Sequence, residues 1–453
     1  MAKPSLPQGT RDFSAEVVRK RNYILATIKA VFEVYGFEPL ETPAMENLET
    51  LMGKYGDEGD KLIFKVLNNG LNNPKNIDKA KAGFEKLLQG KNSPELTERA
   101  LKYDLTIPFA RHIAMNHTKL TFPHRRYQVQ PVWRADRPQK GRYREFTQCD
   151  ADVVGSTSLI NEVELANIYH QVFVNLNLPG YVLKINNRKV LTALAQLAGG
   201  EDKMIDITIA IDKLDKIGLD KVKEELSERA LSDEQISVIE KYLSITGSNE
   251  QKLEQIRLLL GAIPIGAEGI SEIESVIKLA GNVTLEVDFT LARGLNYYTG
   301  TIFEVKAPKE VQMGSIGGGG RYDNLTGLFD VPGIPGVGIS FGVDRIYDVL
   351  EELDLFPAQI QAGTKVIFFN MGTVESNFAY GVMQQIRGSG IACEMFHEPL
   401  KISKQFSYAE RKKIPYAVII GSKEIEQNYC VVKDLSAGSQ EVVVFERLAE
   451  YFN

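Results

Sequence analysis

Residues 134–152 read RADRPQKGRYREFTQCDAD, and this stretch decides the fold. Strand-like runs flank its basic loop Ala135–Gly141, in which Pro138 and Gly141 are turn formers, so we predict a long β-hairpin over residues 122–154. Because strand side chains alternate, we expect one face of the outgoing strand to carry Arg142, Arg144, Phe146, Gln148, Asp150 and Asp152. Arg134 can join them across the hairpin.

This polar face has the chemistry needed for a nucleotide bound beside a small zwitterion. Guanidinium groups pair with phosphate, and an aromatic ring offers a stacking surface. The solvent-facing side of an antiparallel sheet shows the same polar alternation, however. The pattern alone therefore leaves a nucleotide site and a plain sheet surface both open.

Residues 101–111 (LKYDLTIPFAR) place Asp104 and Thr106 two positions apart, so both point the same way if the segment is extended. Together they could hold an ammonium group. The alternative is a turn stabilised by the Asp104 side chain.

Three later segments carry further candidates. Residues 291–305 (LARGLNYYTGTIFEV) bring Arg293 into an apolar context that calls for an anion, beside tyrosines that need hydroxyl partners when buried. The glycines of residues 315–325 (SIGGGGRYDNL) allow a backbone to approach a ligand or act as a hinge, but the segment lacks the Gly-Lys-Ser/Thr ending of a phosphate-binding P-loop. Residues 335–350 (PGVGISFGVDRIYDVL) have the wrong glycine spacing for a dinucleotide fingerprint, while Arg345 at the start of the following helix can reach an anion.

Composition limits the class of protein. The 453 residues carry 53 Lys and Arg against 59 Asp and Glu, so the chain as a whole does not attract polyanions. Its three cysteines form no CxxC pair, and its five histidines have no spacing typical of metal ligands, so we expect no structural or catalytic metal held by side chains. The sequence shows neither a signal peptide nor an apolar run of membrane-spanning length, so we expect a cytoplasmic protein with no membrane partner.

The distribution of strand-like and helix-like patterns along the chain predicts four segments. We expect residues 1–187 and 281–355 to form two parts of one domain, residues 188–280 to be an inserted helical domain, and residues 364–453 to be a separate α/β domain. A helix is predicted from Ser14 to Gly36, a strand over Lys61–Leu67, and an exposed insertion without periodicity over Asn68–Glu95. Ser232 and Gln235 are spaced like a capping box.

Taken together, these segments resemble the class II aminoacyl-tRNA synthetases, specifically the histidyl-tRNA synthetase family. The likeness spans nearly the whole chain: residues 37–45 are similar to motif 1, residues 132–148 to motif 2 and residues 336–350 to motif 3. The segments LARGLNYYTG and GGGGRYDNL resemble the two histidine-specific motifs, preceded by LKYDLT. The resemblance implies an α+β catalytic domain with a mostly antiparallel sheet of six to seven strands flanked by helices, a homodimer across motif 1, and a C-terminal α/β anticodon-binding domain.

The resemblance also implies roles for individual residues. Arg134 and Arg293 would act on the α-phosphate as the catalytic pair, and ATP would be bound by Arg134, Arg142, Phe146 and Arg345. Histidine would be bound by Asp104, Thr106, Gln148, Asp152, Tyr298 and Tyr322, with Asp152 and Tyr298 facing the imidazole nitrogens. Arg137 and Gln139 would meet the acceptor end of the tRNA.

The activity implied is ligation of L-histidine to tRNA(His) through a histidyl-adenylate, with ATP as substrate and Mg²⁺ on its phosphates. Two positions depart from the family pattern: Asn296 stands where Asp is usual, and Lys102 replaces the commoner Arg. The insertion at residues 68–95 is also longer than usual.

Two rival functions remain at this stage. One is a catalytically inactive histidine-sensing paralogue, of the type that regulates ATP phosphoribosyltransferase; such paralogues typically lack the anticodon domain and the ATP-binding arginines. The other is a nucleic-acid-binding scaffold that uses the basic residues Lys401, Lys404, Arg411, Lys412 and Lys413. That scaffold would leave the candidate pocket residues unexplained.

Overall fold

The computed structural model describes residues 3–292, 297–361 and 363–452. The chain divides into two compact units. The first holds residues 1–12 and 24–355, and the second holds residues 13–23 and 356–453. Helix α1 (Ala15–Val34), which matches the helix predicted after Ser14, contributes residues to both.

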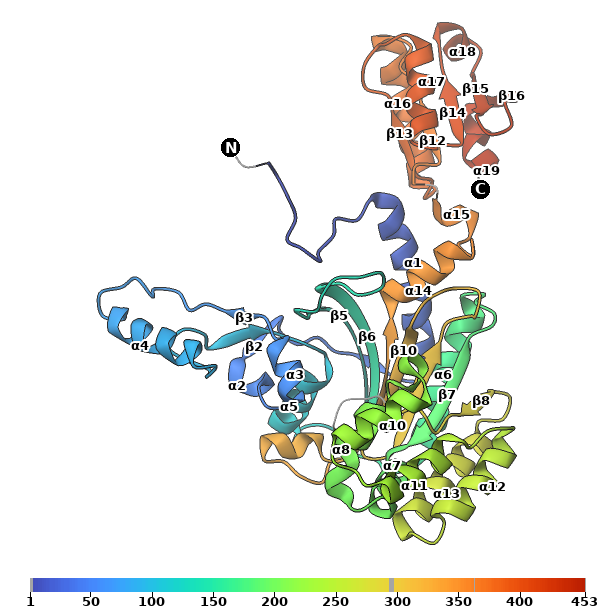
Figure 1. Cartoon of the computed structure of the whole chain (residues 1–453). Coiled ribbons are helices and arrows are strands. Elements are labelled where there is room, and N and C mark those ends of the chain that lie inside the picture. Colours follow the sequence, from blue (N-terminus) through green and yellow to red (C-terminus); the bar gives the residue numbers. More distant parts are fainter. Residues whose placement is uncertain (1–2, 293–296, 362, 453) are drawn as a thin grey trace. The chain divides into compact units, whose positions relative to one another are not determined.

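An eight-stranded sheet forms the centre of the first unit (Figure 1). In spatial order its strands are β1 (Glu38–Pro39), β5 (His124–Trp133), β6 (Glu145–Val154), β11 (Gly336–Gly342), β10 (Ser315–Arg321), β9 (Thr301–Lys306), β7 (Val182–Asn187) and β8 (Leu285–Val287). All neighbours from β5 to β7 are antiparallel, whereas the short edge strands β1 and β8 run parallel to their partners. The mostly antiparallel sheet is confirmed, but it has more strands than the six to seven expected, because these two short edge strands extend it.

Strands β5 and β6 form the predicted hairpin, and their register pairs Arg126 with Asp152 and Gln130 with Gln148. Strand β6 begins only at Glu145, so Arg142 and Arg144 lie in the preceding loop. Strand alternation therefore does not place these two arginines, which corrects the sequence-based expectation for them.

Helices cover one face of the large sheet. Phe341 of β11 packs against Phe32 of α1 and against Tyr169 and Phe173 of α6 (Ile160–Asn175), with ring centroids 4.8 to 5.9 Å apart. The next helix after β11 is α14 (Val343–Glu352). Because side chains alternate along β11, the neighbours of Phe341 face the opposite side of the sheet, where the candidate site lies.

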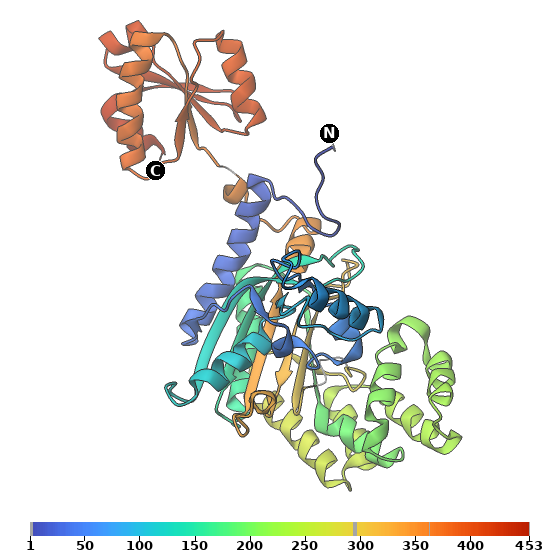
Figure 2. The same cartoon turned by 90° about the vertical axis from the view of Figure 1, so that its left-hand side faces the viewer.

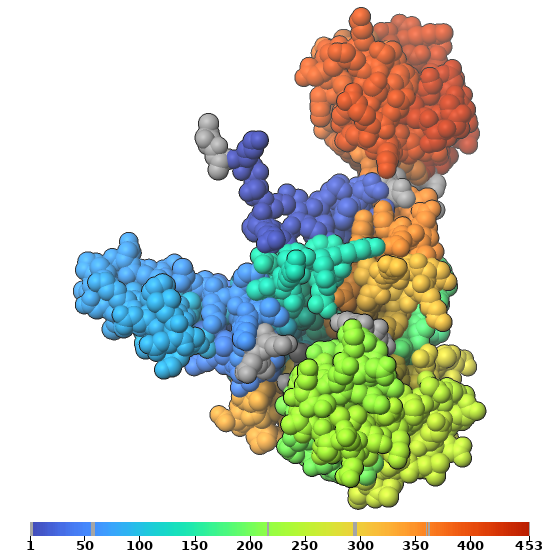
Figure 3. All heavy atoms as spheres, viewed as in Figure 1, coloured from blue at the N-terminus to red at the C-terminus, as the bar shows by residue number. Residues whose placement is uncertain are grey.

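The segment between β1 and β5 forms a small substructure beside the sheet. Its strands are β2 (Met45–Asn47), β4 (Arg99–Leu101) and β3 (Lys65–Val66), and its helices are α2 (Leu48–Leu51), α3 (Gly56–Lys61), α4 (Ile77–Leu88) and α5 (Thr106–Asn116). The strand predicted over Lys61–Leu67 is reduced to two residues. The expected insertion without periodicity is wrong in part, because it contains the helix α4, which projects from the body of the unit (Figure 3).

Between β7 and β8 the chain is helical, as predicted. The helices are α7 (Arg188–Leu197), η1 (Glu201–Lys203), α8 (Met204–Ile211), α9 (Leu214–Ile217), α10 (Leu219–Glu228), α11 (Asp233–Leu243), α12 (Asn249–Leu260) and α13 (Pro264–Leu279). They gather at one end of the large sheet (Figures 1 and 2). The capping box predicted at Ser232 and Gln235 is present at the start of α11.

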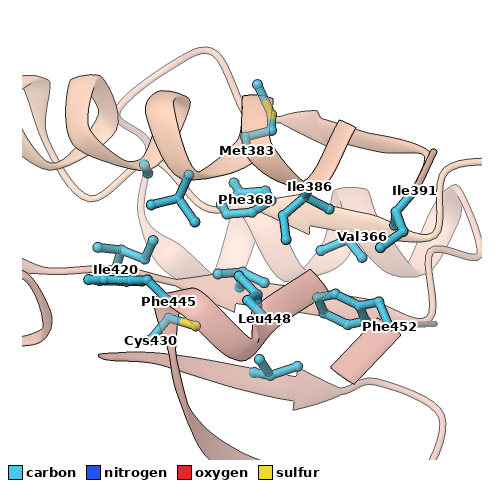
Figure 4. Packing of buried hydrophobic residues seen from close by; sticks show 14 residues of the cluster. Val366, Phe368, Met383, Ile386, Ile391, Ile420, Cys430, Phe445, Leu448 and Phe452 are labelled. Atoms are coloured by element: carbon cyan, nitrogen blue, oxygen red, sulfur yellow. The ribbon is translucent and has the colours of Figure 1, made fainter. Parts of the chain in front are cut away.

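The second unit contains a five-stranded mixed sheet with helices, as expected for an α/β domain. In spatial order the strands are β13 (Cys393–Met395), β12 (Val366–Phe368), β14 (Tyr416–Ile419), β15 (Tyr429–Asp434) and β16 (Gln440–Val444). The helices are α15 (Ala358–Gln361), α16 (Thr373–Gly388), α17 (Ile402–Arg411), α18 (Ser422–Glu426), η3 (Phe445–Arg447) and α19 (Leu448–Phe452). Its own core packs Phe368 and Val366 of β12 against Met383 and Ile386 of α16 (Figure 4).

The remaining short element of the first unit is η2 (Leu325–Phe329), which follows β10 and contacts α5. None of the helices in the described part of the chain has the length and apolar character needed to cross a membrane.

Candidate active site

Two adjoining cavities open on the face of the large sheet opposite α6. The larger has a volume of about 490 Å³ and the smaller about 70 Å³. Both are lined by Arg134, Gln148, Gly318 and Ser340, so the two cavities form one continuous site. The hairpin predicted to carry the chemistry thus supplies the wall that the two cavities share.

The glycines of β10 and β11 make this space. A Cβ atom at Gly319 would lie 2.2 Å from the carbonyl oxygen of Gly338, and one at Gly338 would lie 1.9 Å from Asp152 Oδ1. Both separations are far below van der Waals contact, so larger residues are excluded. Because β10 pairs with β9 on one side and β11 on the other, the glycine run is a fixed wall of the site, and the hinge alternative is wrong.

Three arginines line the larger cavity. Arg134 lies with its guanidinium 4.3 Å from the ring centroid of Tyr103 and 5.1 Å from that of Phe146, and its Nε donates to the Tyr103 carbonyl at 3.0 Å. Arg345, in the first turn of α14, donates to the carbonyls of Gly141 and Ser315 at 2.9 and 2.7 Å. These contacts fix the two side chains in place before any ligand binds.

Arg142 completes the set from an exposed position in the loop before β6. The turn behind it is closed by Gly141, whose φ of +71° favours glycine. Phe146 lines the same cavity. Four predicted residues of the ATP site, Arg134, Arg142, Phe146 and Arg345, are therefore brought together, although no ligand is present to test their roles.

The acidic end of the site is built around Asp104. It lies in the turn before α5, where Oδ1 accepts from Tyr55 Oη at 2.9 Å and from the Ile107 backbone N–H at 3.1 Å. The segment is therefore not extended, and the side-chain-stabilised turn proposed as the alternative is present. Asp104 and Thr106 nevertheless both line the smaller cavity, and Asp104 Oδ2 accepts no hydrogen bond from the described residues. Burial raises the pKa of Asp104.

Asp152 also lines the smaller cavity, and each of its carboxylate oxygens contacts a side chain of the protein. Its Oδ2 forms an ion pair with Arg126 Nη2 at 2.9 Å, and its Oδ1 accepts from the hydroxyl of Tyr322. Burial raises the pKa of Asp152, and Arg126 and the Tyr322 hydroxyl oppose that rise. Burial also raises the pKa of Tyr298 and Tyr322, so both phenols stay protonated and can donate.

Two buried charged residues received no role from the sequence. Arg126 is fully buried with its guanidinium 4.1 Å from the Phe109 ring centroid, and Asp150 lines the smaller cavity beside Gln148 and Asp152. The polar alternation of β5 (Arg126, Gln128, Gln130) was the available signal for Arg126. Gln148 Nε2 donates weakly to Ser340 Oγ at 3.4 Å, and Gln148 Oε1 has no partner among the described residues.

Two predicted site residues line neither cavity, and a third lies outside the described residues. Arg293 and the variant position Asn296 lie outside the described residues. Arg137 and Gln139 are exposed in the loop before β6, where the Gln139 and Arg142 backbones form an isolated bridge, and neither lines the cavities. An exposed position suits contact with a macromolecule but does not test it.

Within the described residues, no group of three or more His, Cys, Asp or Glu side chains is arranged to hold a metal ion.

Comparison with known proteins identifies close relatives over the full length. The model of the family described as "Histidyl-tRNA synthetase" matches residues 80–346, and that of the "Anticodon binding domain" matches residues 365–453. The chain is 50% identical to the histidine–tRNA ligase of Bacteroides fragilis (strain YCH46) over 455 residues, covering 99% of this chain and 98% of that protein.

Solved structures give the same result. The histidyl-tRNA synthetase of Nostoc sp. PCC 7120 has a TM-score of 0.83 and 34% sequence identity, covering 100% of this chain and 99% of that one. An ATP phosphoribosyltransferase regulatory subunit/histidyl-tRNA synthetase from Bacillus halodurans has a TM-score of 0.71 at 21% identity, covering 90% and 97%. At that identity, the second likeness concerns the fold alone.

Proposed function

This chain belongs to the histidyl-tRNA synthetase family, a class II aminoacyl-tRNA synthetase family, and on that basis we propose that it is a histidine–tRNA ligase whose two joined cavities hold ATP and L-histidine. The observation that carries this proposal is the arrangement of charge in one continuous site. Arginines line the larger cavity, and buried carboxyls line the smaller one. The negative triphosphate of ATP complements the arginines, and the positive ammonium group of histidine complements the carboxyls.

In the first step, a carboxylate oxygen of histidine attacks the α-phosphorus of ATP. The bond from that phosphorus to the bridging oxygen of the β-phosphate breaks, and pyrophosphate leaves. No protein nucleophile is needed, because positioning the reactants and stabilising the developing charge are sufficient. Arg134, which lines both cavities, is at the junction where the α-phosphate would lie.

The ATP site would use the remaining residues of the larger cavity. Arg142 and Arg345 would hold the β- and γ-phosphates, and Phe146 would stack on adenine. Mg²⁺ would enter as part of the substrate, bound to phosphate oxygens.

The histidine site would use the smaller cavity. The ammonium group would be bound by Asp104, Thr106 and Gln148, of which Asp104 Oδ2 and Gln148 Oε1 lack partners among the described residues. The imidazole would lie toward Asp152 and Tyr298, with Tyr322 beside them. A neutral imidazole offers one donor and one acceptor, so an acceptor and a phenol can satisfy both nitrogens.

In the second step, a hydroxyl of the terminal ribose of tRNA(His) attacks the histidyl carbonyl, and AMP leaves. Arg137 and Gln139 would meet the acceptor end from their exposed loop, and residues 365–453 would bind the anticodon. We further propose a homodimer formed through residues 37–45 and a cytoplasmic location.

The histidine-sensing regulatory paralogue is less supported. Such a protein needs no triphosphate site, yet Arg134, Arg142 and Arg345 all line the larger cavity. The chain also carries a region that matches an anticodon-binding domain. Both features favour the ligase.

The deciding experiment is exchange of labelled pyrophosphate into ATP, run with each of the twenty amino acids. We expect exchange with histidine alone, followed by charging of tRNA(His). Tight histidine binding without any exchange would contradict the ligase and support the regulatory function.

Arg293→Ala tests the residue that lies outside the described part of the chain. Because a fixed cation at the α-phosphate stabilises charge that develops in the transition state, we expect kcat for exchange to fall by about 100-fold or more. Histidine binding, followed by calorimetry, should remain within a few fold of the parent. Exchange at the parent rate would contradict the catalytic role of Arg293.

A further inference from the structure

Arg321 and Glu162 form a buried ion pair that the proposed chemistry leaves without a task. Arg321 Nε donates to Glu162 Oε1 at 2.5 Å, and its Nη2 donates to Oε2 at 2.7 Å, so the guanidinium binds the carboxylate through two parallel contacts. Arg321 is 4% exposed, and Glu162 is fully buried. Neither residue lines either cavity of the site.

The pair lies on the face of β10 that α6 covers. A Cβ atom at Gly317 would lie 2.8 Å from the ring of Tyr169, a residue of α6. Because side chains alternate along a strand, Arg321, an even number of positions later, projects to that same side and meets Glu162 in the first turn of α6. Tyr322, the next residue, lines the smaller cavity on the opposite side. An ion pair behind the sheet therefore directly precedes a side chain of the site.

Arg321 also touches the segment that carries Tyr298. Its carbonyl accepts from the Thr299 N–H at 2.8 Å, and a Cβ atom at Gly300 would lie 3.0 Å from Arg321 Cδ. Its Nη1 donates to Asp323 Oδ1 at 3.2 Å, and the other oxygen of Asp323 accepts from the Thr299 hydroxyl at 2.8 Å. One arginine thus connects β10 with the residue that directly follows Tyr298.

Stability alone does not account for a pair of this kind. Removing two charges from water carries a large cost, and replacing a buried ion pair with apolar side chains of similar volume is often neutral or stabilising. Apolar side chains cannot supply the fixed direction of two parallel hydrogen bonds. The pair is therefore suited to holding the end of β10 at one position relative to α6.

Resting on the proposed ligase function, we propose that Arg321 and Glu162 are positioning residues: their ion pair holds the backbone at the end of β10, and with it Tyr298 and Tyr322, in the geometry that binds histidine. Both tyrosines line the smaller cavity, and neither lines the larger one. A shift at the end of β10 displaces Tyr322 directly and Tyr298 through Thr299. Loss of the pair therefore weakens histidine binding more than ATP binding.

The first test is Glu162→Gln in histidine-dependent pyrophosphate exchange. The substitution keeps the shape of the side chain but leaves the buried guanidinium of Arg321 without its counter-charge. We expect the KM for histidine to rise by about tenfold or more, while the KM for ATP and kcat stay within about threefold. An unchanged KM for histidine, alongside a parent that performs exchange, would overturn the proposal and leave the ligase function intact.

The double variant Glu162→Met, Arg321→Met separates positioning from folding. Each single substitution leaves one charge unpaired in the interior, so we expect both to lower the melting temperature, whereas the double variant removes both charges and should melt close to the parent. Its KM for histidine should nevertheless rise about tenfold, because the directed contacts are gone. A double variant with the melting temperature and the KM of the parent would show a merely structural pair and would overturn the proposal.

Arg321→Lys tests the geometry of the contact apart from its charge. Lysine keeps the positive charge but lacks the planar fork that binds both carboxylate oxygens. We expect its KM for histidine to rise as in Glu162→Gln. The parent's KM in this variant would show that charge alone is sufficient and would contradict the positioning role.

Glu164→Gln is the matched control. Glu164 lies on the same helix and forms an ion pair with Arg125 at 2.7 Å, and both residues are partly exposed and line neither cavity. We expect its KM for histidine to stay within about threefold of the parent. A rise as large as that of Glu162→Gln would show that the loss of any carboxylate from α6 has this effect, and the specific role of the buried pair would fall.

Discussion

At the residue scale, Lys102 is a buried cation whose surroundings affect its protonation. Its side chain is fully buried, and its ammonium group donates to neutral oxygens, the Thr42 carbonyl at 3.1 Å and Gln130 Oε1 at 2.7 Å. Burial lowers the pKa of Lys102 to about 8, and Glu46 and Glu41 act in the opposite direction. The ammonium group thus connects residues 37–45 with strand β5.

A pH-dependent stability follows for Lys102. The folded chain binds this proton less tightly than the unfolded chain, so the cost of folding with a protonated lysine is fully present below pH 8 and is relieved as pH rises toward 10.5. From pH 7.5 to 9.5, we expect the free energy of unfolding of the parent to rise by roughly 2 kcal/mol relative to that of Lys102→Met. Urea unfolding of both proteins at the two pH values measures this difference. If the free energy of unfolding of the parent relative to Lys102→Met stays constant or falls as the pH rises, the lowered pKa of Lys102 is contradicted.

At the element scale, the helices of the insertion stabilise the edge of the catalytic sheet. Helix α11 begins at the capping box of Ser232 and Gln235, and its Tyr242 donates to the Phe289 carbonyl at 2.8 Å. Phe289 follows β8 and precedes the segment that carries Arg293. Helix α11 therefore begins at a cap formed by residues close together in the sequence and, near its C-terminal end, contacts a residue distant in the sequence.

Ser232→Ala tests the cap of α11. Removing the side-chain acceptor leaves a backbone N–H of the first turn without its partner, so we expect the free energy of unfolding to fall by about 1 kcal/mol. Ser232→Asn keeps an acceptor and should stay close to the parent. Both are measured by urea unfolding monitored by circular dichroism, and an equal loss in the two variants would show that the cap contributes nothing.

The glycine strand β10 and the hairpin illustrate what a local pattern can predict. Alternation along β6 correctly brought Phe146, Gln148, Asp150 and Asp152 toward one site, because strand geometry fixes side-chain direction. It failed for Arg142 and Arg144 because the strand begins later than the pattern indicated. Where an element ends depends on its neighbours, which the hairpin sequence alone does not specify.

At the scale of the whole molecule, the two units have separate cores. The second unit surrounds Phe368, Met383 and Leu448 with its own apolar side chains. Because the second unit has its own core, we expect that a substitution which destabilises it can leave the activity of the first unit intact.

Phe368→Ala tests this independence. Phe368 is fully buried, so its truncation should destabilise the second unit by about 3 to 5 kcal/mol. We expect pyrophosphate exchange to persist, while charging of tRNA(His) falls several-fold. Val374→Ala, at a position of the same unit that is 73% exposed, should change neither activity. Loss of exchange in parallel with charging would contradict separate units.

The sequence by itself determined the strand alternation of the hairpin, the helical texture of the insertion, the cap of α11 and the residue types of the site. These are set by backbone geometry and by side chains close together in the chain. The family motifs added candidate roles, and the cavities bring together ten of the residues they named: Asp104, Thr106, Arg134, Arg142, Phe146, Gln148, Asp152, Tyr298, Tyr322 and Arg345.

Only the tertiary structure decided which of those side chains are bound by other residues of the protein. Asp152 is anchored by Tyr322, 170 residues away in sequence, and by Arg126 on the opposing strand. The sequence near Asp152 does not show these partners, because hydrogen bonding depends on which distant groups the order and register of the strands bring within reach.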